Sequence, residues 1–131
     1  MAGTYPLAIM SSINEGEVVF TPIKYLSSAH AVTLYGRFVY GSGGSQLFAN
    51  IETSLDSGST WIPIACFAFT TINSSKAFNL SGLKDQISPI PIGALSGDEA
   101  ISGILGDWIR ARVVADADYV NSTLDLRMTA R

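Results

Sequence analysis

The side chains that could do chemistry are few and lie far apart in the chain. Five aspartates could supply the pair of carboxylates that glycoside hydrolysis requires, but sequence spacing does not show which of them meet. They are Asp56, Asp107, Asp116, Asp118 and Asp125. The single cysteine, Cys66, and the single histidine, His30, have no GxSxG or similar motif beside them. We therefore predict that the protein is not an enzyme and has no catalytic residues.

Metal and phosphate ligands are equally sparse. Asp116 and Asp118, with Asn121, could bind calcium, but the segment lacks the glycine and the terminal glutamate of an EF-hand loop. His30 has no second histidine or set of cysteines to complete a zinc site. The glycine-rich stretch 41–45 has neither GxGxxG nor GK[ST] spacing, and a strand-like segment follows it. The sequence thus predicts neither a metal nor a cofactor, and Cys66, within an apolar run, fits a buried thiol.

The most distinctive stretch runs from Ser54 to Trp61, between two strand-like segments. An aspartate can hydrogen-bond nearby backbone N–H groups, and Gly58 can adopt positive φ, so we predict a hairpin turn here. The pattern Ser-x-Asp-x-Gly-x-Thr-Trp resembles the Asp-box of sialidase-type propellers and assorted β-sandwich proteins. In that family the box is a fold element without catalytic function. The matching positions are Ser54, Asp56, Gly58, Thr60 and Trp61.

Composition indicates one domain that buries part of its surface against other subunits. The chain has 131 residues, of which 47 % are apolar and only 15 % charged, with a mean hydropathy of +0.30. Soluble domains usually carry about 25 % charged residues. A monomer with so few charges would expose large apolar patches, so we expect a homo-oligomer.

Charge and hydropathy also exclude some partners. The net charge of −3 and the scattered basic residues argue against nucleic-acid binding, which needs clustered lysine and arginine. The N-terminus shows no signal-peptide pattern, and no apolar run approaches the roughly 18 residues of a membrane span. We expect cytoplasmic synthesis without a secretion signal, and no membrane partner.

Alternating apolar residues predict short strands joined by Gly, Ser and Asn turns. In the strand from His30 to Tyr40 one face is apolar, and Gly36 on that face suggests a bulge. The segment 46–55 is typical of a half-buried strand, whereas 61–69 is apolar on both faces, and we expect Trp61 to pack inside. Further strands are predicted at 18–25, 76–80, 108–115 and 123–129. The fold class is all-β, an antiparallel β-sandwich of seven or eight strands in Greek-key or jelly-roll order.

Two segments do not show this alternation of apolar and polar residues. Residues 1–13 are mildly apolar and contain a proline, which suits an edge strand or an extended arm along a neighbour. Residues 83–107 are rich in proline and glycine and form a long connection. Such long loops are usually functional or docked on something. Its apolar residues Ile87, Ile90 and Ile92, with Tyr35 and Tyr40, are our candidate interface.

The later part of the chain resembles small virion proteins of tailed bacteriophages. The resemblance covers residues 46–131 and rests on the Asp-box hairpin, on Gly-Ile-Leu-Gly-Asp-Trp-Ile-Arg-Ala-Arg at 103–112, and on the terminal Thr-Ala-Arg. It implies a structural protein of the virion, foremost a capsid decoration or cement protein that binds the major capsid protein or other virion proteins, and favours a trimer.

Three other functions stay open. A neck or tail component would agree with the same resemblance. A carbohydrate-binding module would share the sandwich, with Trp61, Trp108 and the tyrosines as a stacking platform. A glycosidase fragment is suggested by the Asp-box, although one box in 131 residues cannot build a propeller.

Overall fold

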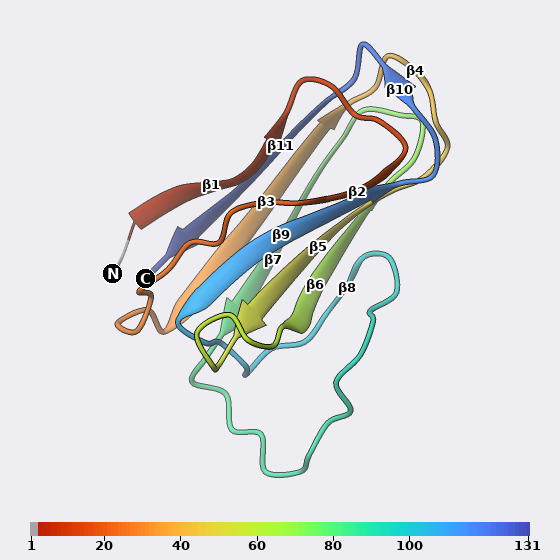
Figure 1. Ribbon diagram of the computed structural model, residues 1–131. Coiled ribbons are helices and arrows are strands. Elements are labelled where there is room, and N and C mark those ends of the chain that lie inside the picture. Colours follow the sequence, from red (N-terminus) through yellow and green to blue (C-terminus); the bar gives the residue numbers. More distant parts are fainter. Residues whose placement is uncertain (1–2) are drawn as a thin grey trace.

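The computed structural model describes residues 3–131 as two packed antiparallel sheets (Figure 1). One sheet has the order β1-β11-β3-β7 and the other β2-β9-β5-β6-β8, while β10 and β4 form a small ribbon at one end. The strands are β1 (Gly3–Met10), β2 (Gly16–Val19), β3 (Ala31–Val39), β4 (Ser42–Gly43), β5 (Leu47–Ser54), β6 (Ile62–Phe69), β7 (Ser74–Ser81), β8 (Glu99–Ala100), β9 (Trp108–Ala115), β10 (Tyr119–Val120) and β11 (Thr123–Ala130). The predicted all-β, antiparallel sandwich is confirmed, and the Greek-key or jelly-roll order stays a prediction. The described residues form eleven strands, three of them only two residues long, where seven or eight were predicted.

The core lies between the two sheets and follows the alternation of the sequence. In β3, β9 and β11 every second residue is buried, as predicted. At one end Phe38 packs against Phe69 and edge-on against Tyr119, with ring centroids 5.4 Å apart in both pairs. Such a continuous apolar layer is the main source of stability for a sandwich.

Gly36 does not mark a bulge, and this prediction is wrong. It pairs in unbroken register with Leu126 of β11 and Lys76 of β7. A Cβ atom at this position would lie 3.2 Å from Cζ of Phe69 and from Cδ1 of Leu126. Gly36 therefore leaves room for an aromatic ring that the facing sheet sends into the core.

β5 is buried on both faces, so the prediction of a half-buried strand is also wrong. The inward residues Leu47, Ala49 and Ile51 are buried as expected, but so are Asn50 and Glu52 on the opposite face. Arginines of β9 and the returning part of the long connection cover that outer face. β5 therefore has a neighbouring strand on each side within its sheet and is covered on both faces.

Residues 3–10 form the edge strand β1, which pairs with β11 of the same chain. The register shifts between Pro6 and Ala8, which fits an edge position for the proline. Leu7 and Ala8 are buried in the core. Of the two alternatives for 1–13, residues 3–10 are thus an edge strand; residues 1 and 2 lie outside the described residues.

The connection 83–107 is long and almost without regular structure. It leaves β7, extends away from the sandwich, and returns along β6, where the two-residue strand β8 pairs with Ala65 and Cys66 (Figure 1). On the way back, Ile101 N–H donates to the carbonyl of Ile64 at 2.9 Å. Only the second half of the connection is therefore fixed to the sandwich by backbone contacts. Residues 3–131 contain no helix that could span a membrane.

Candidate functional site

Asp56 organises the turn between β5 and β6. Its carboxylate accepts hydrogen bonds from the N–H of Thr60 at 2.8 Å, from the hydroxyl of Thr60 at 2.6 Å, and from Ser54 Oγ at 2.9 Å. Ser54 Oγ in turn accepts from Gly58 N–H at 2.8 Å. The bonds from Thr60, then from Ser54, lower the pKa of Asp56. All these partners lie within the turn, so the carboxylate acts as a fold element.

The two tryptophans pack beside this hairpin without entering the core. A Cβ atom on Gly58, whose φ is +91°, would meet the ring of Trp108 at 2.6 Å, so the glycine serves both the turn and the close approach. Trp61 is half-buried, and the Arg110 guanidinium lies 4.1 Å from its ring centroid. The expectation that Trp61 packs inside is therefore wrong.

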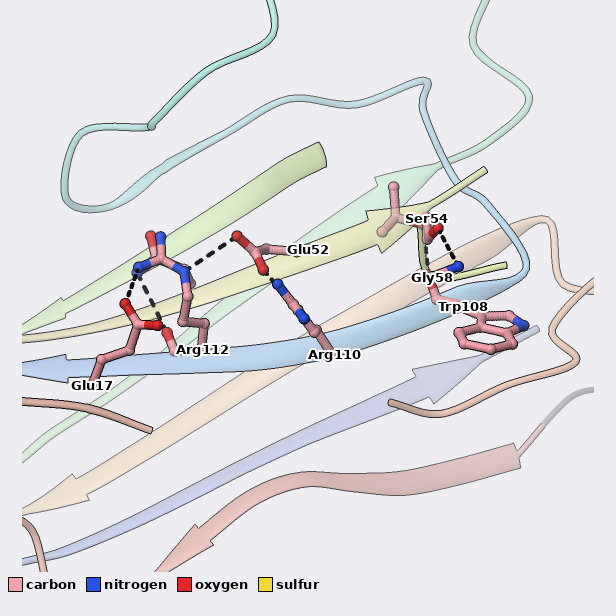
Figure 2. A network of polar contacts seen from close by, with 9 residues as sticks. Glu17, Glu52, Ser54, Gly58, Trp108, Arg110 and Arg112 are labelled. Atoms are coloured by element: carbon pink, nitrogen blue, oxygen red, sulfur yellow. Dashed lines mark hydrogen bonds and ion pairs between the residues drawn. The ribbon is translucent and has the colours of Figure 1, made fainter. Parts of the chain in front are cut away.

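The strongest polar cluster lies on the outer face of the five-stranded sheet (Figure 2). Glu52 of β5 stands opposite Arg110 of β9 and accepts a hydrogen bond from its Nε at 2.9 Å. The other oxygen of Glu52 accepts from Arg112 Nε at 3.3 Å. Arg112 also donates to Glu17 of β2 at 3.1 Å. The cluster thus connects three neighbouring strands, β2, β9 and β5, through cross-strand side-chain pairs.

This cluster can fix charges but offers little for proton transfer. The Glu52 side chain is 7 % exposed, and both of its oxygens are held by guanidinium groups. Burial lowers the pKa of Arg112, but the charges of Glu52 and Glu17 outweigh it, so the net pKa is raised. Because guanidinium groups stay protonated, the arrangement stabilises ionised side chains. We infer that these ion pairs stabilise the association of β2, β9 and β5.

A shallow hollow of about 280 Å³ adjoins the cluster on the same face. Its walls are mainly apolar and include Phe48, Val114 and Leu95, with the amide of Asn50 and the thiol of Cys66 on the floor. Burial raises the pKa of the Cys66 thiol, which is the main cause of its shift. A thiol with a raised pKa is a poor nucleophile, in line with the interpretation of Cys66 as a packed residue.

Asp116, Asp118 and Asp125 each have partners other than an aspartate. Asp116 binds the N–H groups of Ser45 and Gln46, each at 3.0 Å, and the Ser45 hydroxyl. Asp118 accepts from Glu15 N–H at 2.6 Å, and Asp125 pairs with Arg127 on the opposite sheet. Among residues 3–131 no three His, Cys, Asp or Glu side chains cluster in a way that could hold a metal ion.

Asp116 gives the protein a testable acid sensitivity. The hydroxyl of Ser45 and the N–H groups of Gln46 and Ser45 lower its pKa from 3.8 to about 2. A folded-state pKa below the unfolded one stabilises the fold above the unfolded value, and this contribution disappears as the pH falls from 3.8 towards 2. We expect Asp116→Asn to lower Tm at neutral pH, with the difference from wild type shrinking in that acid range. Differential scanning calorimetry across pH, with Asp125→Asn as control, tests this; a constant difference would contradict it.

The candidate interface residues fall into two groups. Tyr35 is exposed on the outer face of the four-stranded sheet, and Ile87 and Ile92 are exposed in the long connection, where Ile90 is half-buried. Tyr40 instead belongs to the end of the sandwich, because its hydroxyl donates to the Gly43 carbonyl at 2.9 Å and its ring contacts Tyr119.

Sequence reasoning missed two ion-paired groups. Glu52 lies far from Arg110 and Arg112 in the sequence, and only the pairing of β5 with β9 shows that they meet. Lys76 of β7 reaches across to Asp98, at 2.7 Å, and to the carbonyl of Ala68. Burial raises the pKa of Asp98, but the bonds from Lys76 and from Ala68 N–H outweigh it and lower the net pKa. No local sequence pattern indicates these pairs, because their members are far apart in the chain.

Comparison with protein-family models, curated proteins and solved structures gives no match for this chain.

Proposed function

We propose that the protein is a non-catalytic structural component of a tailed-bacteriophage virion, foremost a capsid decoration or cement protein. The virion part of this proposal rests on the resemblance of residues 46–131 to small phage structural proteins. The structural part rests on the chain itself, which has few charges and polar side chains engaged in turns and ion pairs. Such a protein would stabilise the head by contacts with the major capsid protein and with copies of itself.

The long connection is the observation that carries the proposal. Twelve consecutive residues, 86–97, carry no charge, and the first half of this stretch stands away from the sandwich (Figure 1). Ile87 is 94 % exposed and Ile92 51 %. Leaving large aliphatic side chains in water forgoes about 1.5–3 kcal/mol for each one that a partner could bury. A docked partner would recover that free energy.

A carbohydrate-binding role finds less support. A stacking platform needs free aromatic faces, but Arg110 lies over the ring of Trp61 and Lys24 lies 4.5 Å from the ring centroid of Trp108. Each tryptophan therefore already has a cation on one face, which leaves less of each ring free to stack on a sugar.

Light scattering and capsid pelleting test the proposal together. We expect the purified chain to form a homo-oligomer, with a trimer favoured, and to sediment with empty capsids of the phage that encodes it. Ile87→Asp should reduce sedimentation, because it places a charge in an apolar contact. Ile72→Asp is a matched control, since Ile72 is also exposed, at 66 %, but lies in the β6–β7 turn. A monomer that does not sediment with capsids would overturn the proposal, and binding to tail structures alone would move it to a neck or tail protein.

A further inference from the structure

We propose that the Ser88–Ile92 segment of one copy adds as an extra strand to the free edge of β7 in a second copy. The inference rests on the self-association in the proposed function, and it names the two surfaces that meet. It does not depend on the virion assignment.

β7 is a sheet edge with unpaired backbone groups. In the four-stranded sheet β7 pairs only with β3, so its other side carries no strand among the described residues. At the end of the strand, Gly82 N–H points towards β3 and donates to the backbone carbonyl of His30. Ser81 N–H points the other way and donates to Ser102 Oγ in the long connection. Residues 81, 79, 77 and 75 therefore direct their N–H and C=O groups away from β3, since direction alternates along a strand.

This edge also lacks the usual protection. β7 contains neither proline nor glycine and keeps an unbroken register with β3 over its full length. Its one charged residue, Lys76, turns towards the facing sheet, where it binds Asp98 and the carbonyl of Ala68. Prolines, bulges and outward lysines are the devices that normally keep an edge strand from pairing. The edge at Ser75, Ala77 and Asn79 has none of them.

The Ser88–Ile92 segment offers the complementary row of groups. Ser88 and Ile90 each precede a proline, which restricts them to extended conformations. In an extended segment, Ser88, Ile90 and Ile92 direct their N–H and C=O groups to one side. The other side belongs to Pro89 and Pro91, which have no N–H. The segment can therefore pair along one edge only, which is the situation in which prolines are tolerated in a sheet.

Three alternate residues on each partner can thus face one another. All strand pairs among the described residues are antiparallel. An antiparallel addition of the segment would place Ser88 opposite Asn79, Ile90 opposite Ala77 and Ile92 opposite Ser75. Residues directly opposite each other lie on the same face of a sheet, so the side chain of Ile90 would cover Ala77. It would also reach Tyr35 of β3, which stands opposite Ala77 and is 42 % exposed. The prolines would then end the sheet on its new outer edge.

Charge and symmetry agree with a second copy as the partner. Neither the 86–97 stretch nor the outward residues of β7 carry a charge, so two copies meet without repulsion. In the single chain the carbonyl of Ser88 accepts a hydrogen bond from the Gln86 side-chain amide at 3.1 Å. On pairing with β7, that carbonyl would either accept a second hydrogen bond or lose the one from Gln86. Because segment and edge lie on different parts of the chain, the contact can be exchanged in a dimer or pass around a ring such as a trimer.

Proline variants test the backbone pairing. Ile90→Pro removes an N–H from the pairing side while keeping the segment extended, and should weaken self-association roughly tenfold or more in light scattering. Ile90→Ala keeps that N–H and should weaken it less. Ile87→Pro removes an N–H from the proline side and should leave the hydrogen-bond pairing intact. Ile87 is exposed and Ile90 half-buried, and both lie in the connection outside the two sheets, so we expect all three variants to fold. Equal effects of Ile90→Pro and Ile87→Pro would overturn the inference.

Crosslinking tests which residues meet. Ala77→Cys and Ile90→Cys are prepared as separate proteins in a Cys66→Ser background, mixed, and oxidised; a disulfide-linked dimer of one of each is the expected product. Mixing Ala77→Cys with Ile87→Cys is the control and should give much less. A stable oligomer without the first crosslink would overturn this inference and leave the proposed function standing. A chain that stays monomeric but still binds capsids would also overturn it.

Discussion

Glu52→Gln is expected to lower the free energy of unfolding by about 2–3 kcal/mol. The change removes a carboxylate that two partly buried guanidinium groups share, those of Arg110 and Arg112, although Arg112 keeps Glu17 as a second partner. The glutamine amide can accept from one arginine, but its NH₂ group would face the other, so donor meets donor. Breaking a buried ion pair typically costs 3–5 kcal/mol, and the lower value reflects arginine side chains that are 22 % and 26 % exposed.

Urea unfolding of both proteins measures this effect. Asp125→Asn provides a matched control, because Asp125 and Arg127 also form an ion pair but are 40 % and 48 % exposed. Exposed pairs contribute at most about 1 kcal/mol, so the control should differ little from wild type. If the two variants lost the same stability, the inference that the Glu52 ion pairs stabilise the association of β2, β9 and β5 would be wrong.

The class of fold could be predicted from the sequence because it depends on local alternation. The strand predicted at 108–115 coincides with β9, and the apolar face predicted for the strand from His30 to Tyr40 is the buried face of β3. Alternation identifies two faces of a strand, but it does not show what covers the second face. β5 illustrates this limit, since its polar face is buried under arginines from β9, a strand more than fifty residues away.

Other errors came from features with two physical readings. A glycine on the apolar face of a strand can signal a bulge or a close approach, and at Gly36 it is the approach of Phe69 that requires it. Trp61 was expected inside because its neighbours are apolar, but its ring lies under Arg110 at the edge of the hairpin. In both cases the deciding partner comes from a distant strand, so the local sequence could not distinguish the alternatives.

The turn at 54–61 was more predictable because its contacts are local. Ser54, Asp56 and Thr60 satisfy one another within a few residues, so their spacing alone carries the information. The turn is also supported from outside, however, by Gly106 of the long connection. Gly106 N–H donates to Thr53 Oγ1 at 2.8 Å, and Thr53 Oγ1 donates to the carbonyl of Trp108 at 3.0 Å.

Gly106→Ala is expected to destabilise the protein by about 3 kcal/mol. A Cβ atom on Gly106 would overlap the carbonyl oxygen of Ser54 and contact the side chain of Leu55 at 3.0 Å. The overlap is with backbone, so relief requires a shift of β5 or of the connection, and overpacking of this kind costs 1–3 kcal/mol or more. The φ angle of Gly106 is not positive, so the effect would come from contact and not from backbone strain.

Gly93→Ala is the matched control for Gly106→Ala, because Gly93 lies in the same connection and a Cβ atom there has nothing within 4 Å. Without steric conflict, alanine should leave stability unchanged or raise it by up to about 1 kcal/mol, since it reduces the entropy of the unfolded chain. Thermal unfolding of the two variants compares the two halves of one loop. If Gly106→Ala melted with Gly93→Ala, residues 100–107 would not be the support of the hairpin, and Ser54 and Asp56 would hold the turn by themselves.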